Sequence, residues 1–273
     1  MHALSLLLSV FDWRSRAVLG RNFKVFLRNW KTAMLPPAME PVVYFVAFGI
    51  GLATYVGGVP HEGRMVDYGS WVAPGMMAYT AFATPYYEAL YSAYVRMFYQ
   101  KTWDGILATQ VEIRHLVWGE ILWAGLRGVC NTLVVGIVLS GFAAAGMLSF
   151  DFAAIPAVLA LAALAGFAFA AFALIFTAIV PAIDHMNYPV FLIGLPLSFV
   201  SHTYFPIESQ SSVVEALMGL NPLYHLAETF RSLLLDGKLG SHFGAAVGSS
   251  FALLVLAYLA SYALTRRRVV RDA

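Results

Sequence analysis

The hydrophobic and polar positions of this 273-residue chain fall in long blocks. Six of the apolar blocks are long enough to cross a bilayer, because about 20 helical residues span roughly 30 Å of hydrocarbon. The six blocks are residues 35–57, 71–95, 117–141, 152–180, 187–205 and 243–265. The pattern therefore predicts an all-α integral membrane protein with six transmembrane helices.

A polar segment, residues 96–120, joins the second apolar block to the third. Its sequence is RMFYQKTWDGILATQVEIRHLVWGE, in which charges of both signs interleave with Ile, Leu, Val and Trp. The segment is too polar to cross a bilayer and too apolar for a plain solvated loop. This mixture predicts a short helix at the membrane surface, with one side available to another protein.

The region before the first block, residues 12–31, is amphipathic. Its apolar residues recur at helical spacing on one side: Leu19, Phe23, Phe26, Leu27 and Trp30. Its cations fall on the other side: Arg14, Arg21, Lys24, Arg28 and Lys31. Such a helix lies in the headgroup plane, where its cations meet anionic lipid.

Lys and Arg residues are distributed unequally between the two sides of the predicted spans. With the amino terminus inside, the inner segments hold thirteen of them and the outer segments three. The excess of Lys and Arg marks the cytoplasmic side. Both termini and the 96–120 segment are therefore expected in the cytoplasm.

Composition supports the membrane prediction. Hydrophobic residues make up 60% of the chain and charged residues 12%, and the mean hydropathy is +0.72. A soluble domain is about 25% charged.

The net charge of +2 argues against a nucleic-acid-binding surface. Asp184 and His185 lack a third ligand, so we expect no metal site.

Four ionisable side chains within or beside the predicted spans are costly there and are therefore candidate functional groups. They are Glu40, Glu88, Glu120 and Arg127. Glu120 and Arg127 share a helical face but stand about 10 Å apart along the axis. They could pair only if both side chains stretch, and partners on other helices are an equal alternative. Structural neutralisation is the other interpretation of this charge pair.

The second block carries two stripes of aromatic residues. Tyr79 and Tyr86 belong to one stripe, and Tyr87, Tyr91 and Tyr94 to the other. Such stripes serve as helix packing or, because phenols stack on sugars and donate hydrogen bonds, as a wall for an amphipathic glycolipid. With Glu88, these tyrosines are candidates for a substrate path.

The outer segment, residues 205–236, is too apolar for a simple loop and too short to span. Asn221 suits a helix N-cap, Pro222 a first helical residue and Gly237 a stop. We expect a re-entrant or interfacial helix that caps an exit. The gate candidates are Phe205, Pro206, Asn221, Pro222 and His225.

Three stretches resemble the ABC-2 family of exporter permeases. They are EPVVYFVAFGIGLATYVGG at 40–58, the 96–120 segment, and FPIESQSSVVEALMGLNPLYHLAETFRSLLL at 205–235. Within the family, QKTWDGILATQ is most similar to the nodulation-factor, lipooligosaccharide branch. Polysaccharide, O-antigen and teichoic-acid permeases are close relatives, and drug exporters share the outline.

The resemblance implies one transmembrane domain over residues 1–273, with a coupling region at 96–116. It implies a transport subunit that is not an enzyme, paired with a second permease copy and docked on two ATPase subunits in a bacterial inner membrane. The cargo would be a lipid-linked oligosaccharide or polysaccharide, or alternatively a drug. The ATPase contact would fall on Lys101, Thr102, Trp103, Asp104, Gly105 and Thr109.

No G-x-x-x-x-G-K-[ST] phosphate loop occurs in the sequence, so ATP and Mg²⁺ are expected on the partner chain rather than on this one. Two other classes of membrane protein fit the sequence less well. An ion-driven transporter tends to show matching halves and paired interrupted helices, which are not evident here. An intramembrane enzyme needs a clustered nucleophile and base, whereas the histidines are scattered along the chain.

Overall fold

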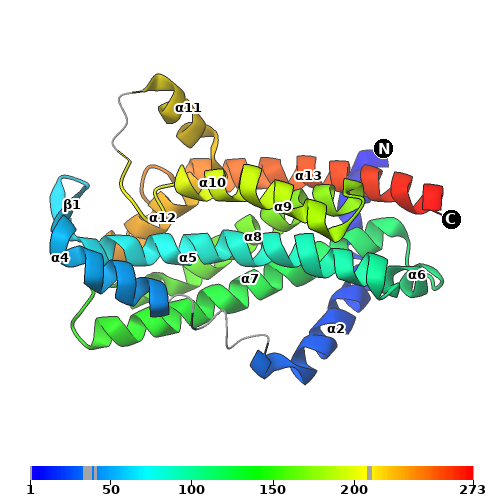
Figure 1. The fold of residues 1–273 in the computed structure, drawn as a ribbon, viewed down its shortest axis with the longest axis horizontal. Helices are drawn as coiled ribbons and strands as arrows, with labels where there is room; N and C mark the ends of the chain where they lie inside the picture. Colours follow the sequence, from blue (N-terminus) through cyan, green and yellow to red (C-terminus); the bar gives the residue numbers. More distant parts are fainter. Residues whose placement is uncertain (1, 33–38, 40–41, 208–210, 273) are drawn as a thin grey trace.

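The computed structural model describes residues 2–32, 39, 42–207 and 211–272. Glu40, one of the candidate intramembrane charges, lies outside the described residues. The chain forms an elongated bundle of helices (Figure 1). One end of the bundle, here the hairpin end, carries β1 (Gly58–His61) and β2 (Arg64–Asp67); the opposite end, here the α6 end, carries α6 (Thr102–Leu107) and both termini.

The amino-terminal half of the chain contains the following helical elements: α1 (His2–Leu8), η1 (Ser9–Phe11), α2 (Trp13–Arg28), η2 (Phe45–Leu52), α4 (Ala53–Val56), α5 (Tyr68–Tyr87), η3 (Glu88–Ser92), η4 (Val95–Tyr99), α6 and α7 (Ile113–Ala144). The carboxy-terminal half contains η5 (Phe152–Ala154), α8 (Ile155–Ile179), η6 (Ile183–Met186), α9 (Asn187–Pro189), η7 (Val190–Gly194), α10 (Leu195–Phe199), α11 (Ser212–Leu220), α12 (Pro222–Asp236) and α13 (Phe243–Asp272).

Three helical stretches of the described residues are long and apolar enough to cross a membrane: Ile113–Ala144, Phe152–Ile179 and Phe243–Arg271. They correspond to three of the six predicted blocks. The 71–95 block forms α5 and continues through the π-helical turns η3 and η4. The 187–205 block is divided into α9, η7 and α10, because Pro189 and Pro196 each lack a backbone donor.

The core is built where α5, α7, α8 and α13 pack against one another. Helices α7 and α8 approach closely at two glycines: a Cβ on Gly166 would lie 3.4 Å from the Cα of Gly125. Small residues permit such close contact between helices in a membrane, where packing rather than hydrophobicity drives association.

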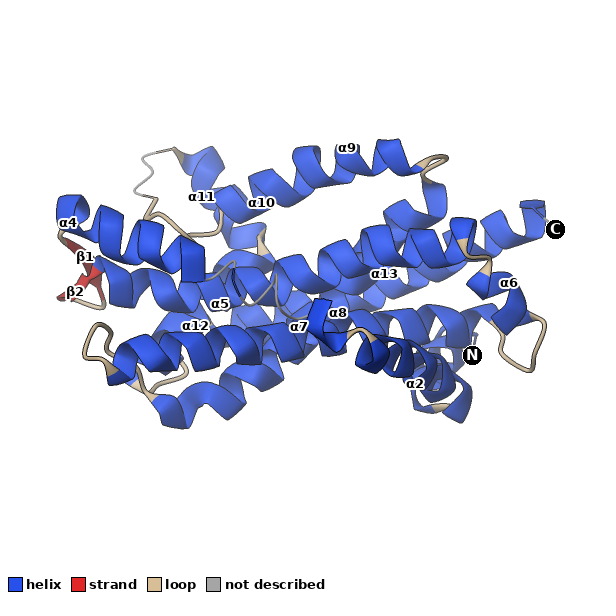
Figure 2. Cartoon of the chain, turned by 60° about the horizontal axis from the view of Figure 1, so that its bottom comes forward, coloured by secondary structure: helices blue, strands red, loops and turns tan. Residues whose placement is uncertain are grey.

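Within the described residues, the β1–β2 hairpin is where the structure departs from the all-α prediction. Gly58 pairs with Asp67 and His61 with Arg64, which leaves Glu62 and Gly63 as a two-residue turn. Their φ angles of 45° and 80° are both positive, as a twisted two-residue hairpin turn requires. Figure 2 shows the two strands at one extremity of the helical bundle.

A helix is present where residues 12–31 predicted one: α2 covers Trp13–Arg28. The side chain of Asp12 caps it by accepting a hydrogen bond from the Arg14 amide at 3.0 Å. The face buried against α7 carries Ser15, Val18 and Asn22 rather than large apolar residues. Val18 packs on Gly119, where an added Cβ would lie 2.4 Å from the Val18 Cβ.

Three of the five residues predicted for the apolar side are exposed, whereas Leu19 and Phe26 are half-buried and Phe26 packs against Trp123 of α7. Phe23, Leu27 and Trp30 are 38%, 51% and 53% exposed. Their position suits a helix that presents its large apolar side chains to lipid and its small ones to the bundle.

The predicted helix after Asn221 is confirmed as α12. The Asn221 side chain caps it by accepting from the Leu223 amide at 3.0 Å, and Gly237, with a φ of 65°, ends it. Helix α12 lies at the hairpin end, where it packs against α5 and α13.

Candidate functional site

The π-helical turns η3 and η4 and the helix α7 bring four charged side chains together toward the α6 end. Glu88 opens η3 and Arg96 lies in η4, while Glu120 and Arg127 project from α7. These four residues, with the indoles of Trp103 and Trp123, are called the ionic cluster. Wide helical turns of this kind are rare and occur often at functional sites.

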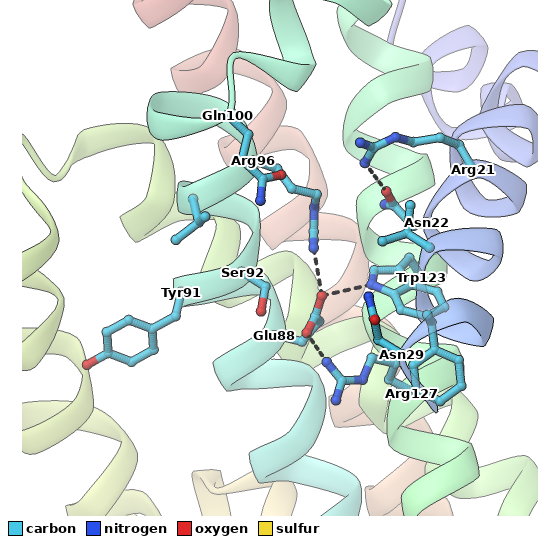
Figure 3. A pocket seen from close by; sticks show the side chains of 13 residues that line it. Arg21, Asn22, Asn29, Glu88, Tyr91, Ser92, Arg96, Gln100, Trp123 and Arg127 are labelled. Carbon is cyan, nitrogen blue, oxygen red and sulfur yellow. Dashed lines mark hydrogen bonds and ion pairs between the residues drawn. The ribbon is translucent and has the colours of Figure 1, made fainter. Parts of the chain in front are cut away.

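Glu88 receives three hydrogen bonds (Figure 3). Its Oε1 accepts from Arg96 Nη1 at 2.8 Å and from Trp123 Nε1 at 2.8 Å. Its Oε2 accepts from Arg127 Nη1. The Glu88 side chain is only 3% exposed, so its charge is neutralised inside the protein rather than by water.

Glu120 is the second acceptor of the ionic cluster. Arg96 donates to it through Nε at 3.2 Å and Nη2 at 2.5 Å. Arg96 therefore bridges two buried carboxylates, one from its own helix and one from α7. Glu120 pairs with Arg96 and Arg127 pairs with Glu88, so the two residues do not pair with each other. Their spacing left open either a direct pair or partners on other helices, and the structure shows partners on another helix.

Trp103 connects α6 to the ionic cluster. Its Nε1 donates to Glu120 Oε1 at 3.1 Å, and its side chain is 1% exposed. Helix α6 is thus held by a buried hydrogen bond to α7. Charge-assisted hydrogen bonds of this kind are about twice as strong as neutral ones, and low dielectric strengthens them further.

The other sequence-predicted coupling residues surround this anchor. Lys101 and Asp104 are each 67% exposed at the side chain and stand 3.9 Å apart. Gly105 and Thr109 are exposed, and half-buried Thr102 accepts from Arg21 Nη2 at 3.4 Å. The arrangement gives α6 a buried attachment and an exposed face.

The tyrosines of the candidate substrate path divide into two groups. Tyr86 and Tyr94 are buried, and their hydroxyls donate to the backbone oxygens of Pro189 at 2.9 Å and Pro181 at 3.0 Å. These two hydrogen bonds stabilise the contact between the continuous helical stretch α5–η3–η4 and the segment that follows α8. The half-buried tyrosines are Tyr79, Tyr87 and Tyr91.

The gate candidates lie together at the hairpin end. Asn221 is buried, and its amide donates to the backbone oxygen of Leu197 at 2.9 Å, which joins the start of α12 to α10. His225 is also buried, Pro222 is half-buried, and Phe205 and Pro206 are exposed.

A second buried ion pair at the hairpin end was missed by the sequence reasoning. Arg231 is fully buried and donates to Glu228 Oε1 at 2.6 Å, and its guanidinium carbon lies 3.7 Å from the centre of the Trp71 ring. His202 Nδ1 lies 3.1 Å from the same Glu228 oxygen. The i, i+3 spacing of Glu228 and Arg231 on one helix was the signal that could have revealed the pair.

Histidine contacts extend this pair toward α13. His225 Nε2 donates to the Gly219 oxygen at 2.8 Å, which leaves its Nδ1 to accept from His242 Nδ1 at 3.0 Å. Burial lowers the pKa of His242, with a further lowering from His225 and His202 and an opposing effect from Glu228. The neutral form of His242 is therefore favoured in the folded protein.

We expect folded-state stability to fall as pH drops below about 6.5, the ordinary histidine value. The unfolded chain takes up the proton at His242 first, so the contribution of this residue is present above that pH and lost below it. His242→Gln, which can donate to His225 but does not titrate, will show a smaller fall in melting temperature between pH 7.5 and 5.5. His185→Gln, an exposed histidine at the other end, is the control and will keep the wild-type slope. Equal slopes for wild type and His242→Gln would contradict the assignment.

Comparison with known proteins places this architecture among membrane transport subunits. The chain belongs to the ABC-2 type transporter family, whose model matches residues 15–235. The resemblance drawn from three sequence stretches is thereby confirmed.

Individual relatives match along nearly the whole chain. Nodulation protein J of Bradyrhizobium diazoefficiens is 30% identical over 263 residues, which is 96% of each chain. Nodulation protein J of Rhizobium meliloti is 30% identical over 258 residues, covering 94% of this chain and 95% of its own. The inner membrane transport permease YadH of Escherichia coli is 23% identical over 260 residues, covering 92% and 94%.

Proposed function

We propose that this chain is the permease subunit of an ATP-driven exporter, moving a lipid-linked oligosaccharide or similar amphiphile out across the bacterial inner membrane. The observation that carries the proposal is the buried hydrogen bond from Trp103 to Glu120. It joins the exposed face of α6 to charges that lie between two long helices. A push on α6 would therefore be transmitted to α5 and α7 rather than absorbed by a loop.

The proposal includes a topology. The α6 end is cytoplasmic, as the excess of Lys and Arg indicates, and the hairpin end faces outward. The chain crosses the membrane six times, with the 35–57, 71–95 and 187–205 blocks added to the three long apolar helices. Helices α11 and α12 cap the outer end without crossing.

Partners follow from the same proposal. Two ATPase subunits bind ATP and Mg²⁺ and contact α6 through Lys101, Asp104, Gly105 and Thr109, while Thr102 and Trp103 hold the helix in place. A second permease copy completes the path. Relatives named as nodulation protein J favour an oligosaccharide-bearing cargo over a drug, which is the alternative.

The ionic cluster disfavours an ion-driven mechanism. A proton relay needs a carboxylate that alternates between charged and neutral forms. Glu88 and Glu120 instead each accept from Arg96, and Glu88 accepts from a second arginine. Neither acid is placed as a proton carrier, so the cluster suits a mechanical connection.

Reconstitution tests the function and the substrate path together. With an ATPase encoded beside the gene, vanadate-sensitive hydrolysis should require both chains and rise on adding a lipid-linked oligosaccharide. The double substitution Tyr87→Ala and Tyr91→Ala should raise, about tenfold, the concentration of oligosaccharide that half-maximally stimulates ATP hydrolysis. The reason is that each aromatic contact contributes about 0.5–1.5 kcal/mol. Tyr55→Ala, at an 87% exposed residue, should leave this concentration unchanged. Transport by this chain alone under a proton gradient would overturn the function; an unchanged half-saturating concentration would assign the two tyrosines to packing.

A further inference from the structure

A cavity of about 360 Å³ lies beside the ionic cluster. It is bounded by α2 on one side, by the η3–η4 segment on another and by α7 at its base (Figure 3). Three arginines line it: Arg21 from α2, Arg96 from η4 and Arg127 from α7. The carboxylates beside them are Glu88, which also lines it, and Glu120, which lies behind Arg96. Among the described residues, three guanidinium groups therefore lie beside two carboxylates.

Arg21 carries the unbalanced charge. Its guanidinium donates to two neutral oxygens, Asn22 Oδ1 at 2.9 Å and Thr102 Oγ1 at 3.4 Å. Burial and the nearby charge of Arg96 lower the pKa of Arg21, with Glu120 opposing them. Among the described residues Arg21 forms no salt bridge, so this half-buried cation makes the cavity electropositive.

The cavity wall also offers neutral hydrogen-bond donors. Ser92, Asn29 and Gln100 line it, and within the part of the chain that the structure describes their side chains make no hydrogen bond. Hydroxyl and amide donors beside guanidinium groups form the set that binds phosphate oxygens, since each oxygen accepts several charge-assisted hydrogen bonds.

Apolar side chains adjoin the same opening. Val25 and Phe26 line the cavity, and Val25 is 47% exposed. Leu27 on the same helix and Trp30, just beyond its end, are more than half exposed. A ligand whose phosphate occupies the cavity could therefore place an acyl chain against the exposed apolar residues of α2. A free phosphate ion has no acyl chain and could not make this contact.

We propose that this cavity binds the phosphate headgroup of a membrane amphiphile, with Arg21 as its principal ligand. The assignment rests on the proposed function only in placing α2 at the membrane surface. Occupancy would join α2 to η4 and α7 through one shared anion. The phosphate could come from an anionic phospholipid or from a phosphate-bearing cargo, which share this chemistry.

Native mass spectrometry of the purified permease, without an ATPase, tests the site. The probes are phosphatidylglycerol and, in a separate arm, a phosphate-linked glycolipid, each compared with zwitterionic phosphatidylcholine. Wild type should retain at least one anionic amphiphile in preference to phosphatidylcholine. Arg21→Gln should reduce that retention about tenfold, as expected for loss of a charge-assisted contact. Arg21→Lys, which keeps the charge, should retain most of it.

Arg28→Gln is the matched control, because Arg28 is an exposed cation on the same helix that does not line the cavity. An equal loss in Arg28→Gln and Arg21→Gln would mean diffuse attraction by α2 and would overturn the site. Displacement of the lipid by equimolar inorganic phosphate would assign a free-anion site and overturn the amphiphile. Retention of phosphatidylglycerol identifies bulk lipid as an occupant, and retention of the glycolipid alone identifies cargo. Either result supports the site if Arg21→Gln loses the retained amphiphile and Arg28→Gln keeps it. Matching melting temperatures of the variants confirm that binding, not folding, has changed.

Discussion

Glu120→Ala will destabilise the protein by about 3–5 kcal/mol, the usual cost of removing one partner from a buried ion pair. The substitution deprives Arg96 of two hydrogen bonds and Trp103 of its acceptor. Glu120 is 1% exposed, so water cannot replace the lost carboxylate. For a chain of this size the loss corresponds to a fall of roughly 10 °C in melting temperature in detergent.

The paired variant Arg96→Met with Glu120→Leu separates stability from coupling. Replacing both charges with apolar groups leaves Glu88 with Arg127 and removes the unpaired cation, and such replacements are often neutral for stability. We expect the melting temperature to return to within a few degrees of wild type. Substrate-stimulated ATP hydrolysis should stay low, because Trp103 still lacks an acceptor. An unchanged melting temperature in Glu120→Ala, or full coupling in the paired variant, would contradict this role of the ionic cluster.

Asp104→Lys is expected to uncouple ATP hydrolysis from transport while the permease stays folded. The residue is 67% exposed, and its contact with Lys101 at 3.9 Å is a surface pair that contributes little to stability. At an interface with another protein, however, charge reversal costs several kcal/mol. Stimulated hydrolysis and export should therefore fall at least tenfold, on the order of 1.4 kcal/mol or more.

Glu62→Lys provides the matched reversal, since Glu62 is an exposed acid on the turn at the opposite end of the bundle. It should leave export unchanged. Melting temperature and membrane insertion of both variants should equal those of wild type. Normal export by Asp104→Lys would remove α6 from the ATPase contact.

Local sequence signals predicted much of the fold. Asn221 caps α12 where a cap was expected, and Gly237 ends the same helix where a stop was expected. These signals are reliable because a cap satisfies backbone groups within three residues of itself. The short helix in the 96–120 segment was predicted from its composition, because a mixture of charged and apolar residues suits a surface helix.

The ionic cluster could not be predicted, because its partners are distant in sequence. Glu88 meets Arg127 from 39 residues away, and Glu120 meets Arg96 from 24 residues away. Periodicity assigns residues to a helical face, but lipid-facing and protein-facing surfaces are both apolar in a membrane, so it does not say which face is buried. Periodicity therefore did not show that α2 buries Ser15, Val18 and Asn22 against the bundle while Phe23 and Leu27 stay exposed.

The π-helical turn η3 and the turn η4, which contains Arg96, set the rotational phase of the helix that continues from α5. Each residue added to or taken from a helix turns everything beyond it by about 100°. Tightening η3 into an ordinary α-helical turn would swing the guanidinium away from both carboxylates without altering a single side chain. The winding of the backbone at η3 therefore determines which carboxylates Arg96 can reach, and we expect a one-residue change of register between Glu88 and Arg96 to break its ion pairs.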